Sequence, residues 1–374
     1  MRKQKYIKKN MISNSIFFEE IRGLITTARS TVVKDVDYIQ VYTYFEIGRR
    51  IVEQEQRGEK RAKYGKMLIK ELAMKLTMEF GDGFSKRNLE YMRKFYLTYP
   101  DRAGQIAQTL SAQFEKRQML FGKLQKTQTS PAQLFQYKIM SCKFTLSWSH
   151  YVFLVGIDNI SERSFYEIEA VAQNWSLREL KRQFNSSLYE RLALSRGKKE
   201  VRKLSKKGQL VEKPHDLLKN PYVLEFLGLK EGSKYSESDL ESAIIDKIEE
   251  FLLELGKGFL FESRQKRFTF DEDHFFVDLV FYNRLLRCYV LIDLKIGELT
   301  HQNLGQMQMY VNYFDRFIKR PEENPTIGII LCRKKTDALV EITLPKDANV
   351  HAKEYRLYLP SKDELRRKLL DWTS

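Results

Sequence analysis

Three charged side chains interrupt apolar runs in the last third of this 374-residue chain. Asp278 lies inside the run FFVDLVFY at 275–282. Asp293 and Lys295 lie inside the run YVLIDLK at 289–295. Burying an unpaired carboxylate or ammonium is costly, so such residues need charged partners or a metal ion. Because two carboxylates favour the hard cations Mg²⁺ and Mn²⁺, the pattern predicts a divalent metal site with a lysine beside it.

The spacing between the two runs predicts that these side chains converge. Residues 283–286 can turn the two strands into a hairpin. Since side chains alternate along a strand, Asp293 and Lys295 share one face. If the turn centres near 284–285, Asp278 falls on the same face across the hairpin. A lysine placed there can orient or help deprotonate a water molecule at the metal and offset phosphate charge. The alternative is an ion pair on an edge strand without a catalytic role.

An Asp on one strand followed by Asp-x-Lys on the next resembles the PD-(D/E)xK nuclease superfamily. Within that superfamily, the chain resembles the YhcG-like family. The C-terminal stretches that carry this resemblance are 276–282, 291–295 and 305–315. The N-terminal stretches are 146–151 and 174–180, so the resemblance covers most of the chain.

The resemblance implies a core of order αβββαβ and hydrolysis of phosphodiester bonds with a divalent metal ion. By this likeness Asp278 and Asp293 hold the ion, Mg²⁺ or Mn²⁺, and Lys295 serves the attacking water. The chain departs from the superfamily pattern at Val277, where that pattern has proline.

The same resemblance suggests three further site residues. Glu241, in a helix expected at 236–255, matches the acid that the superfamily often adds to the metal site from its first core helix. The alternative is an exposed first-turn acid favoured by the helix dipole. Gln306 and Tyr310 resemble the Gln-x-x-x-Tyr element of some nuclease branches, and their spacing places both on one helix face. The alternative is that Tyr310 belongs to the core and Gln306 is its polar neighbour.

The basic residues are concentrated in the N-terminal part of the chain. The whole chain has 65 Lys and Arg and 49 Asp and Glu, a net charge of +16. Residues 1–210 hold 40 basic and 21 acidic side chains, whereas residues 211–374 hold 25 and 28. This asymmetry predicts a polyanionic partner, and we expect nucleic acid, most of all DNA. The alternative is a basic surface that only aids solubility.

A helix at 67–80, a glycine-containing turn at 81–84 and a helix at 86–99 resemble a helix-turn-helix. The second helix would present five polar and basic side chains to phosphates or base edges: Lys86, Arg87, Asn88, Arg93 and Lys94. A further basic helix at 176–195 adds the candidates Arg178 and Arg182. The alternative is a solvated face of a plain helical bundle.

The order of the expected elements predicts an α+β protein with two domains. Residues 1–200 are expected to form a helical, basic, DNA-binding domain, in which the glutamine-rich stretch 101–142 is a linker or a helical excursion. Residues 201–220 are expected to be a basic hinge. In residues 221–374, helices alternate with strand-like runs, and the last strand-like run is 355–359. This order predicts an α/β nuclease core with a mixed sheet of order αβββαβ.

Composition also excludes some classes of protein. No run of about 18 uncharged apolar residues occurs, so we expect no membrane-spanning helix. No apolar signal core follows the basic start. The three cysteines are too far apart in sequence for a zinc ribbon and favour a reducing cytoplasm.

The sequence therefore predicts a cytoplasmic, metal-dependent nuclease that acts on DNA. A homodimer is expected because cutting a duplex needs two active sites or two events. A second hypothesis is a nucleic-acid-binding or assembly protein that does not cut, but retention of the costly charges Asp278, Asp293 and Lys295 disfavours it. A third is a glycosidase that uses the two aspartates, which the adjacent lysine and the basic partner domain disfavour.

Overall fold

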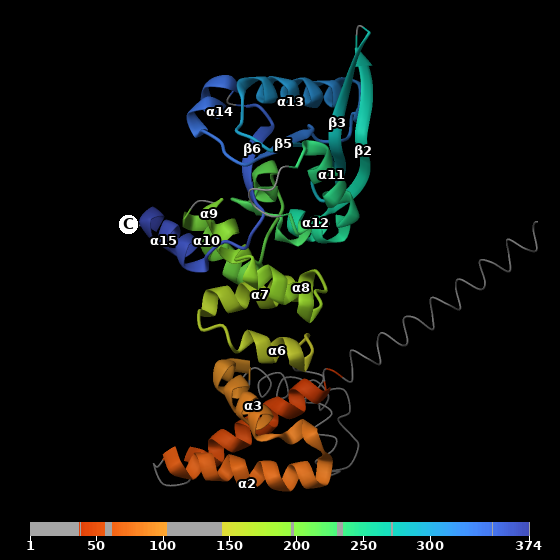
Figure 1. The fold of residues 1–374 in the computed structure, drawn as a ribbon. Coiled ribbons are helices and arrows are strands. Elements are labelled where there is room, and N and C mark those ends of the chain that lie inside the picture. The colour runs from red at the N-terminus through yellow and green to blue at the C-terminus, as the bar shows by residue number, and fades with distance from the viewer. Residues whose placement is uncertain are drawn as a thin grey trace, which may run out of the picture. The chain divides into compact units, whose positions relative to one another are not determined.

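The computed structural model describes residues 37, 39–56, 62–102, 144–195, 198–229, 235–270, 272–345 and 347–373. The chain divides into two compact units, Met1–Asp158 and Asn159–Ser374, whose elements are drawn in Figure 1. Most of the expected linker at 101–142, namely residues 103–142, lies outside the described residues. Across the described part of the chain, no helix has the length and apolarity needed to cross a lipid bilayer. A cytoplasmic location stays a prediction.

The described N-terminal unit is helical and has an aromatic core. Its elements are a helix at 39–56, α2 (Ala62–Phe80), the 3₁₀ turn η1 (Asp82–Phe84), α3 (Lys86–Thr98) and α6 (Trp148–Leu154). Helix α3 begins after Ser85, whose hydroxyl accepts the backbone N–H of Asn88. Phe45, Phe95 and Phe144 pack against one another with ring centroids between 4.8 and 5.7 Å apart. The order α2, η1, α3 follows the expected helix-turn-helix segments, and its docking on DNA stays a proposal.

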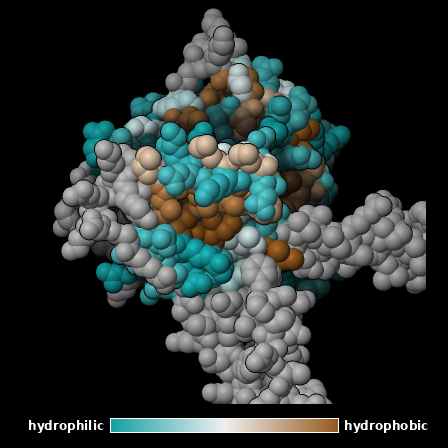
Figure 2. Space-filling model, turned by 90° about the horizontal axis from the view of Figure 1, so that it is seen from below, coloured by the Kyte–Doolittle hydropathy of each residue, from teal (hydrophilic) through white to brown (hydrophobic). Residues whose placement is uncertain are grey.

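Apolar side chains also reach the surface of this unit. Met74, Met78 and Phe80 of α2 are all more than half exposed. In the view of Figure 2, apolar residues gather in a patch that is bordered by hydrophilic ones. Such patches are typical of interaction surfaces.

The C-terminal unit is built on a six-stranded mixed sheet. Its strands are β1 (Tyr222–Val223), β2 (Phe259–Phe270), β3 (Asp273–Asn283), β4 (Cys288–Leu294), β5 (Ile327–Cys332) and β6 (Val350–Arg356), in the order β1-β6-β5-β4-β3-β2. Strands β2, β3 and β4 are antiparallel, whereas β4, β5, β6 and β1 are parallel. The carboxyl ends of the four parallel strands therefore lie at one edge. The β2–β3 hairpin extends beyond that edge, because β3 pairs with β4 only from Leu279 on (Figure 1).

Helices cover both faces of this sheet (Figure 1). Helices α11 (Glu237–Asp246) and α12 (Ile248–Leu255) share one core with the sheet, in which Leu240 and Ile292 are fully buried. Helix α13 (His301–Tyr313) belongs to the other core, with Met307 and Leu291. Two cores form because successive side chains of a buried strand point to opposite faces. The predicted order αβββαβ is confirmed.

Two expected elements have different bounds in the structure. The helix expected at 236–255 is broken at Lys247, whose backbone leaves the helical region. The last strand is 350–356 rather than 355–359, because Val350 and Ala352 are buried in the sheet while residues 358–359 are exposed. Polar residues stand between the buried ones in this strand, so it does not form the apolar run on which the sequence prediction was based. The remaining C-terminal elements are η2 (Pro214–Leu217), η3 (Glu225–Leu227), the π-helix η4 (Phe314–Ile318), α14 (Asp337–Thr343) and α15 (Lys362–Thr373).

Two helices that we expected in the N-terminal domain belong to the C-terminal unit: α7 (Ile160–Ala172), and a helix expected at 176–195 that the structure divides into α8 (Leu177–Asn185) and α9 (Leu188–Leu194). Helix α10 (Lys198–Lys207), which begins just before the expected hinge, also belongs to this unit. The hinge expected at 201–220 also lies inside this unit. Polar contacts hold it there: the carboxylate of Glu169 accepts hydrogen bonds from the backbone of Gln209 at 2.7 Å and from Lys257 Nζ at 2.8 Å. The basic composition of 201–220 suggested a hinge. The contact that holds this segment in the unit joins Gln209 to Glu169, 40 residues away, and so is not visible as a local pattern.

A buried carboxylate, Glu254 of α12, joins these helices to the sheet. Its oxygens accept hydrogen bonds from Arg182 at 3.1 Å and from Arg191 at 3.2 Å. A third comes from the backbone N–H of Val223 in β1, at 3.0 Å. Burial alone would raise the pKa of Glu254, but Arg191, Lys219 and Arg182 outweigh it and lower the pKa to about 2. Glu254 is therefore ionised and fully paired in the folded protein.

Replacing Glu254 with Ala should strongly destabilise the C-terminal unit, because it leaves Arg191 and Lys219 buried without their counter-ion. We expect a loss of about 3–5 kcal/mol in the free energy of unfolding, measured by urea denaturation of the full chain. Glu249→Ala removes an exposed acid from the same helix and should change stability by less than about 0.5 kcal/mol. Equal effects of the two substitutions would show that the buried network does not hold the unit together.

Candidate active site at the carboxyl edge of the sheet

The two aspartates meet where the β3–β4 ladder ends. The last paired positions are Leu279 and Ile292, so the next position in this register sets Asp278 opposite Asp293. The side chain of Asp278 replaces the missing ladder partner: its Oδ2 accepts the backbone N–H of Leu294 at 2.8 Å. Cross-strand neighbours share one face of a sheet. The structure thus brings the two carboxylates together.

Lys295 lies beside this pair. Its Nζ is 3.0 Å from Asp293 Oδ2 and 3.3 Å from Glu237 Oε2, a residue in the first turn of α11. Burial alone would lower the pKa of Lys295, but Asp293 and Glu237 outweigh burial and raise it. The ammonium is therefore charged at neutral pH. Glu237 was not among the candidates from sequence, because no motif distinguishes it from the other acids at the start of this helix.

Asp293 is the carboxylate in the most unfavourable environment. Its side chain is 4% exposed, whereas Asp278 is half-buried. Burial, followed by the neighbouring charge of Asp278, raises the pKa of Asp293 to about 7, although Lys295 opposes this shift. A carboxyl group that titrates near neutral pH beside a second carboxylate is typical of a functional site.

Helix α13 supplies a polar pair next to the aspartates. Gln306 Nε2 donates a hydrogen bond to the hydroxyl of Tyr310 at 2.5 Å. Burial, and then the charge of Asp293, raises the pKa of Tyr310 to about 12, so its hydroxyl stays protonated. Tyr310 is also part of the core against this face of the sheet. Its ring packs in the core, as one of the two sequence interpretations has it, and its hydroxyl is affected by the charge of Asp293; a catalytic role for Tyr310 stays a proposal.

Glu241 is buried and connected to Asp278 through Gln265. The Gln265 side-chain amide donates to Glu241 Oε2 at 2.5 Å and to Asp278 Oδ1 at 3.1 Å. Glu241 is 3% exposed, so the alternative of an exposed first-turn acid does not describe it. Arg264 adds an ion pair to Glu241 at 3.1 Å. One amide nitrogen thus lies between two carboxylates, a place where a cation would also be stable.

Sequence reasoning missed Gln265 because its position depends on an irregularity of the β2 backbone. Gln265 has a φ of 45°, in the left-handed region that a non-glycine residue rarely adopts. Its neighbours Arg264 and Lys266 pair with Leu279 and Val277, so Gln265 lies across from Asp278. No sequence pattern in β2 predicts this backbone conformation. The only available indication was that Gln265 is a polar amide in a strand next to the predicted site.

The donor set fits a small divalent cation. Among the described residues, no group of three or more His, Cys, Asp or Glu side chains is arranged to enclose a metal ion. Mg²⁺ does not need such a cage, because it usually keeps several waters and binds through one or two carboxylates and substrate phosphates. The paired oxygens of Asp278 and Asp293 meet this requirement. Burial and then the charge of Asp278 raise the pKa of Asp293, and a bound cation would relieve this repulsion between the two carboxylates.

Two of the basic candidates on α3 are exposed on one face. Arg87 and Lys94 lie seven residues apart, on the same side as Tyr91. The guanidinium of Arg87 lies over the Tyr91 ring at 5.7 Å from its centroid. Lys86 is also exposed but forms an ion pair with Glu90 at 3.8 Å. The face with Arg87 and Lys94 is therefore the better candidate for phosphate contacts.

The other two candidates on α3 make contacts inside the N-terminal unit. Asn88 accepts a hydrogen bond from Trp148 Nε1 at 2.9 Å. Arg93 pairs with Glu55 at 2.6 Å. We assign both to packing between helices of this unit.

The candidates on α8 also differ from each other. Arg178 is exposed. Arg182 is mostly buried and pairs with Glu225 at 3.1 Å and with Glu254. We assign Arg182 to the packing of the C-terminal unit and keep Arg178 as a candidate for nucleic-acid binding.

Two solved structures resemble part of the chain. A repair endonuclease from Pyrococcus abyssi is 17% identical, covers 35% of this chain and 50% of that chain, and has a TM-score of 0.23. A structure described as an EndoMS–dsDNA2 complex is 15% identical, covers 36% and 51% of the two chains, and has a TM-score of 0.24. Likenesses this remote carry no functional argument.

Sequence comparisons are far more specific. Residues 215–370 match the family described as YhcG PDDEXK nuclease domain. Residues 20–191 match the family described as DUF1016 N-terminal domain. The chain is 40% identical over 352 residues to the Escherichia coli (strain K12) protein named "Putative nuclease YhcG", covering 93% of this chain and 91% of that protein. With this identity over nearly all of both chains, the protein belongs to the YhcG family, and its C-terminal part is the PD-(D/E)xK nuclease domain of that family.

Proposed function

We propose that this protein is a metal-dependent nuclease that hydrolyses phosphodiester bonds in DNA. The observation that carries the proposal is the meeting of Asp278 and Asp293, with Lys295 beside them, at the carboxyl edge of the sheet. Mg²⁺ or Mn²⁺ would be held by the two aspartates. Bound there, the ion would supply Lewis acidity toward the phosphate and make water a better nucleophile.

The side chains around the aspartates have separate roles in this proposal. The charged ammonium of Lys295 stabilises the negative charge that grows on the phosphate oxygens during attack by water. It does not act as a base, because its raised pKa keeps it protonated. Gln265 positions Asp278 and Glu241 by holding one oxygen of each. The protonated Tyr310 hydroxyl, held by Gln306, keeps a hydrogen-bond donor near Asp293.

The N-terminal unit is proposed to bind the nucleic acid. Residues 1–158 hold 28 basic and 15 acidic side chains, and α3 presents Arg87 and Lys94 to solvent. Phosphate contacts of this kind give affinity without sequence preference. A homodimer, with one active site for each strand, stays part of the proposal.

Replacing Asp293 with Ala should abolish metal-dependent cleavage while nucleic-acid binding persists. We expect a fall in rate of at least about 10³-fold, because one of the two carboxylates that would hold the cation is lost. Wild type and variant would be incubated with linear duplex, branched and single-stranded DNA and with RNA, in Mg²⁺, Mn²⁺ or EDTA. Asp246→Ala, which removes an exposed acid at the end of α11, is the matched control.

Three outcomes separate the hypotheses. Cleavage that needs metal and vanishes only in Asp293→Ala supports the nuclease and names its substrate. Metal-dependent cleavage by Asp293→Ala would overturn the site. Salt-sensitive binding without any cleavage by wild type would favour the non-cleaving nucleic-acid-binding or assembly protein.

The metal-free protein should lose stability as pH rises, because the pKa of Asp293 is raised from 3.8 to about 7 by folding. Between these values the folded state binds a proton that the unfolded state releases. The free energy of unfolding therefore falls with pH in this window, by up to about 1.4 kcal/mol per pH unit. Asp293→Asn should flatten this slope in EDTA, measured by urea denaturation from pH 4 to 8. Added Mg²⁺ should stabilise wild type more at pH 8 than at pH 5, and a slope unchanged in the variant would contradict the assigned environment.

Removing the charges of Arg87 and Lys94 together should weaken DNA binding and its dependence on salt. Each phosphate contact contributes about 0.9 to the slope of log K against log salt concentration, so the double alanine variant should lower the slope by about 2. Lys70→Ala with Lys75→Ala removes the same charge from exposed positions of α2. Equal slopes for the two double variants would show that α3 has no special part in binding.

A further inference from the structure

The backbone conformation of Gln265 is unusual for a residue inside a strand. Among the described residues, five that are not glycine have a positive φ: Asn174, Ser187, Gln265, Glu272 and Arg287. Four of these lie in turns, and Gln265 alone lies within a strand, β2. Such a conformation is strained and persists only where the surroundings hold it. The two hydrogen bonds of the Gln265 side chain are contacts that can do so.

The side-chain amide of Gln265 lies between two carboxylates of the candidate site. Its Nε2 donates to Glu241 Oε2 at 2.5 Å and to Asp278 Oδ1 at 3.1 Å. The nitrogen end of the amide belongs in this place, because its oxygen end would be repelled by both acids. A neutral donor therefore stands where two acidic side chains converge.

Neighbouring groups also hold these two acids from their other sides. Asp278 Oδ2 accepts the backbone N–H of Leu294 at 2.8 Å. Arg264 Nε lies 3.1 Å from Glu241 Oε1, although this oxygen makes no hydrogen bond to a described residue. Both acids therefore keep contacts that do not depend on the amide.

The amide is the part of this group that can move. Gln265 is exposed, whereas Glu241 is buried and Asp278 is half-buried. A long exposed side chain can turn into solvent by changing its rotamer. A cation that arrives from solvent can therefore take the place of the amide without displacing either acid.

A divalent cation suits the two oxygens better than an amide does. Carboxylate oxygens are preferred ligands of Mg²⁺ and Mn²⁺. The amide is neutral, so it offsets only part of the negative charge of Glu241 and Asp278. Because the amide and a cation would use the same two oxygens, they exclude each other.

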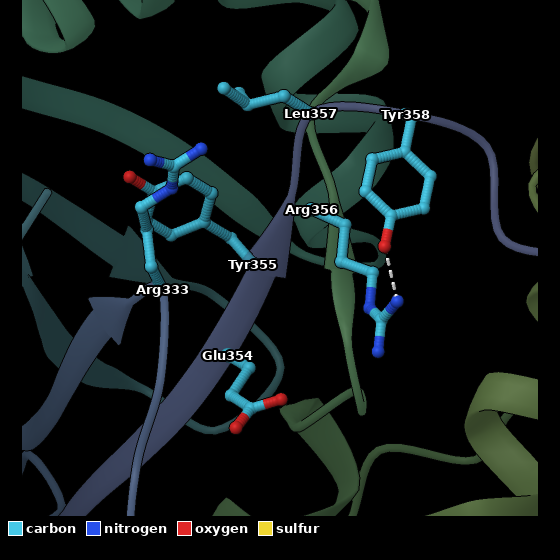
Figure 3. Close-up of a pocket in the computed structure, with 6 residues that line it drawn as sticks. All are labelled: Arg333, Glu354, Tyr355, Arg356, Leu357 and Tyr358. Carbon is cyan, nitrogen blue, oxygen red and sulfur yellow. Dashed lines mark hydrogen bonds between the residues drawn. The ribbon is translucent and has the colours of Figure 1, made fainter. Parts of the chain in front are cut away.

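A polar pocket in the same unit lacks this arrangement. The pocket has a volume of about 230 Å³ and is lined by Arg333, Glu354, Tyr355, Arg356, Leu357 and Tyr358 (Figure 3). Glu354 is the one acid among these six residues, and Arg356 donates to the hydroxyl of Tyr358. One acid in the company of two arginines gives no reason to expect a cation there.

We propose that Gln265 competes with the metal ion for Glu241 Oε2 and Asp278 Oδ1, so that Mg²⁺ or Mn²⁺ displaces the amide when it binds. The proposal rests on the proposed function for the identity of the ion and adds a residue that sets the affinity for it. It deepens the positioning role of Gln265: the amide holds the two acids together until the ion replaces it. Displacement also removes contacts that hold the positive φ, so metal binding and the backbone of β2 are coupled.

Removing the amide should strengthen metal binding. Mn²⁺ would be titrated into the full chain without nucleic acid, by isothermal titration calorimetry. Gln265→Ala should bind Mn²⁺ about tenfold more tightly than wild type, because a hydrogen bond to a charged group contributes about this factor or more. Gln54→Ala removes an exposed glutamine from the helix at 39–56 and should leave the Kd unchanged.

An amide that only positions the acids would have the opposite effect. Gln265→Ala would then bind Mn²⁺ more weakly, and a weaker or unchanged Kd overturns the proposal. Melting temperatures in EDTA identify a variant that fails to fold. Gln265→Glu keeps the size of the side chain, removes the donor and adds a ligand oxygen, so it should also bind Mn²⁺ more tightly.

A double-mutant cycle with Glu241 locates the competition. In a Glu241→Gln background the amide has lost one of its two charged partners. The gain in affinity from Gln265→Ala should therefore shrink from about tenfold to about threefold or less. An undiminished gain would show that Gln265 does not act through Glu241.

The coupling to the backbone has its own test. Gln265→Gly and Gln265→Ala both remove the amide, but glycine adopts a positive φ without strain. In EDTA, Gln265→Gly should therefore melt at a higher temperature than Gln265→Ala, and saturating Mn²⁺ should reduce the difference. Equal melting temperatures in EDTA would show that the backbone at this position is not strained.

These measurements separate the competition from the nuclease function. Tighter Mn²⁺ binding by Gln265→Ala, with no cleavage by wild type, would support the competition and overturn the nuclease. Metal-dependent cleavage by wild type, with an unchanged Kd in Gln265→Ala, would do the reverse. If neither protein binds Mn²⁺, both proposals are wrong.

Discussion

The closeness of Asp278 and Asp293 is the constraint on which the C-terminal unit depends for its chemistry. Two carboxylates side by side in a mostly buried place repel each other, and the pKa of Asp293 rises to about 7 as a result of burial and of this neighbour. The fold enforces the contact, because the β3–β4 ladder ends one position earlier and Asp278 takes over the N–H of Leu294. In the proposed function a bound cation would remove this repulsion, so the least favourable place in the unit would also be the one best prepared for phosphodiester hydrolysis.

A second buried carboxylate, Glu254, stabilises the fold and differs from Asp293 in its surroundings. Glu254 has its pKa lowered to about 2 because Arg191, Lys219 and Arg182 surround it. Asp293 has its pKa raised, with Lys295 as its ion-pair partner. Burial is common to both, so the difference lies in the number of cations that the fold provides. The surplus of cations around Glu254 is what a structural junction requires, whereas the smaller number around Asp293 is what the proposed metal site would require.

Much of this organisation could be read from sequence, because it depends on local patterns. Apolar runs of strand length predicted the order αβββαβ, and the period of two predicted that Asp278 and Asp293 face each other. What could not be predicted depends on pairing between distant residues or on backbone geometry. The partner of Arg182 is Glu254, 72 residues away, so a basic residue that looked free for DNA belongs to the packing. Gln265 reaches Asp278 only because its φ is positive.

The parallel part of the sheet explains why Lys295 lies next to the carboxylate pair. Parallel strands end at a common edge, and Lys295 comes directly after β4, whose Asp293 lies opposite Asp278 of the antiparallel neighbour β3. An antiparallel sheet would place alternate strand ends at opposite edges. The basic excess of residues 1–210 attracts a polyanion over long range. In the proposed function this attraction brings the nucleic acid to the protein, whereas the fixed positions of the two aspartates and Lys295 would act only on a phosphate that reaches them.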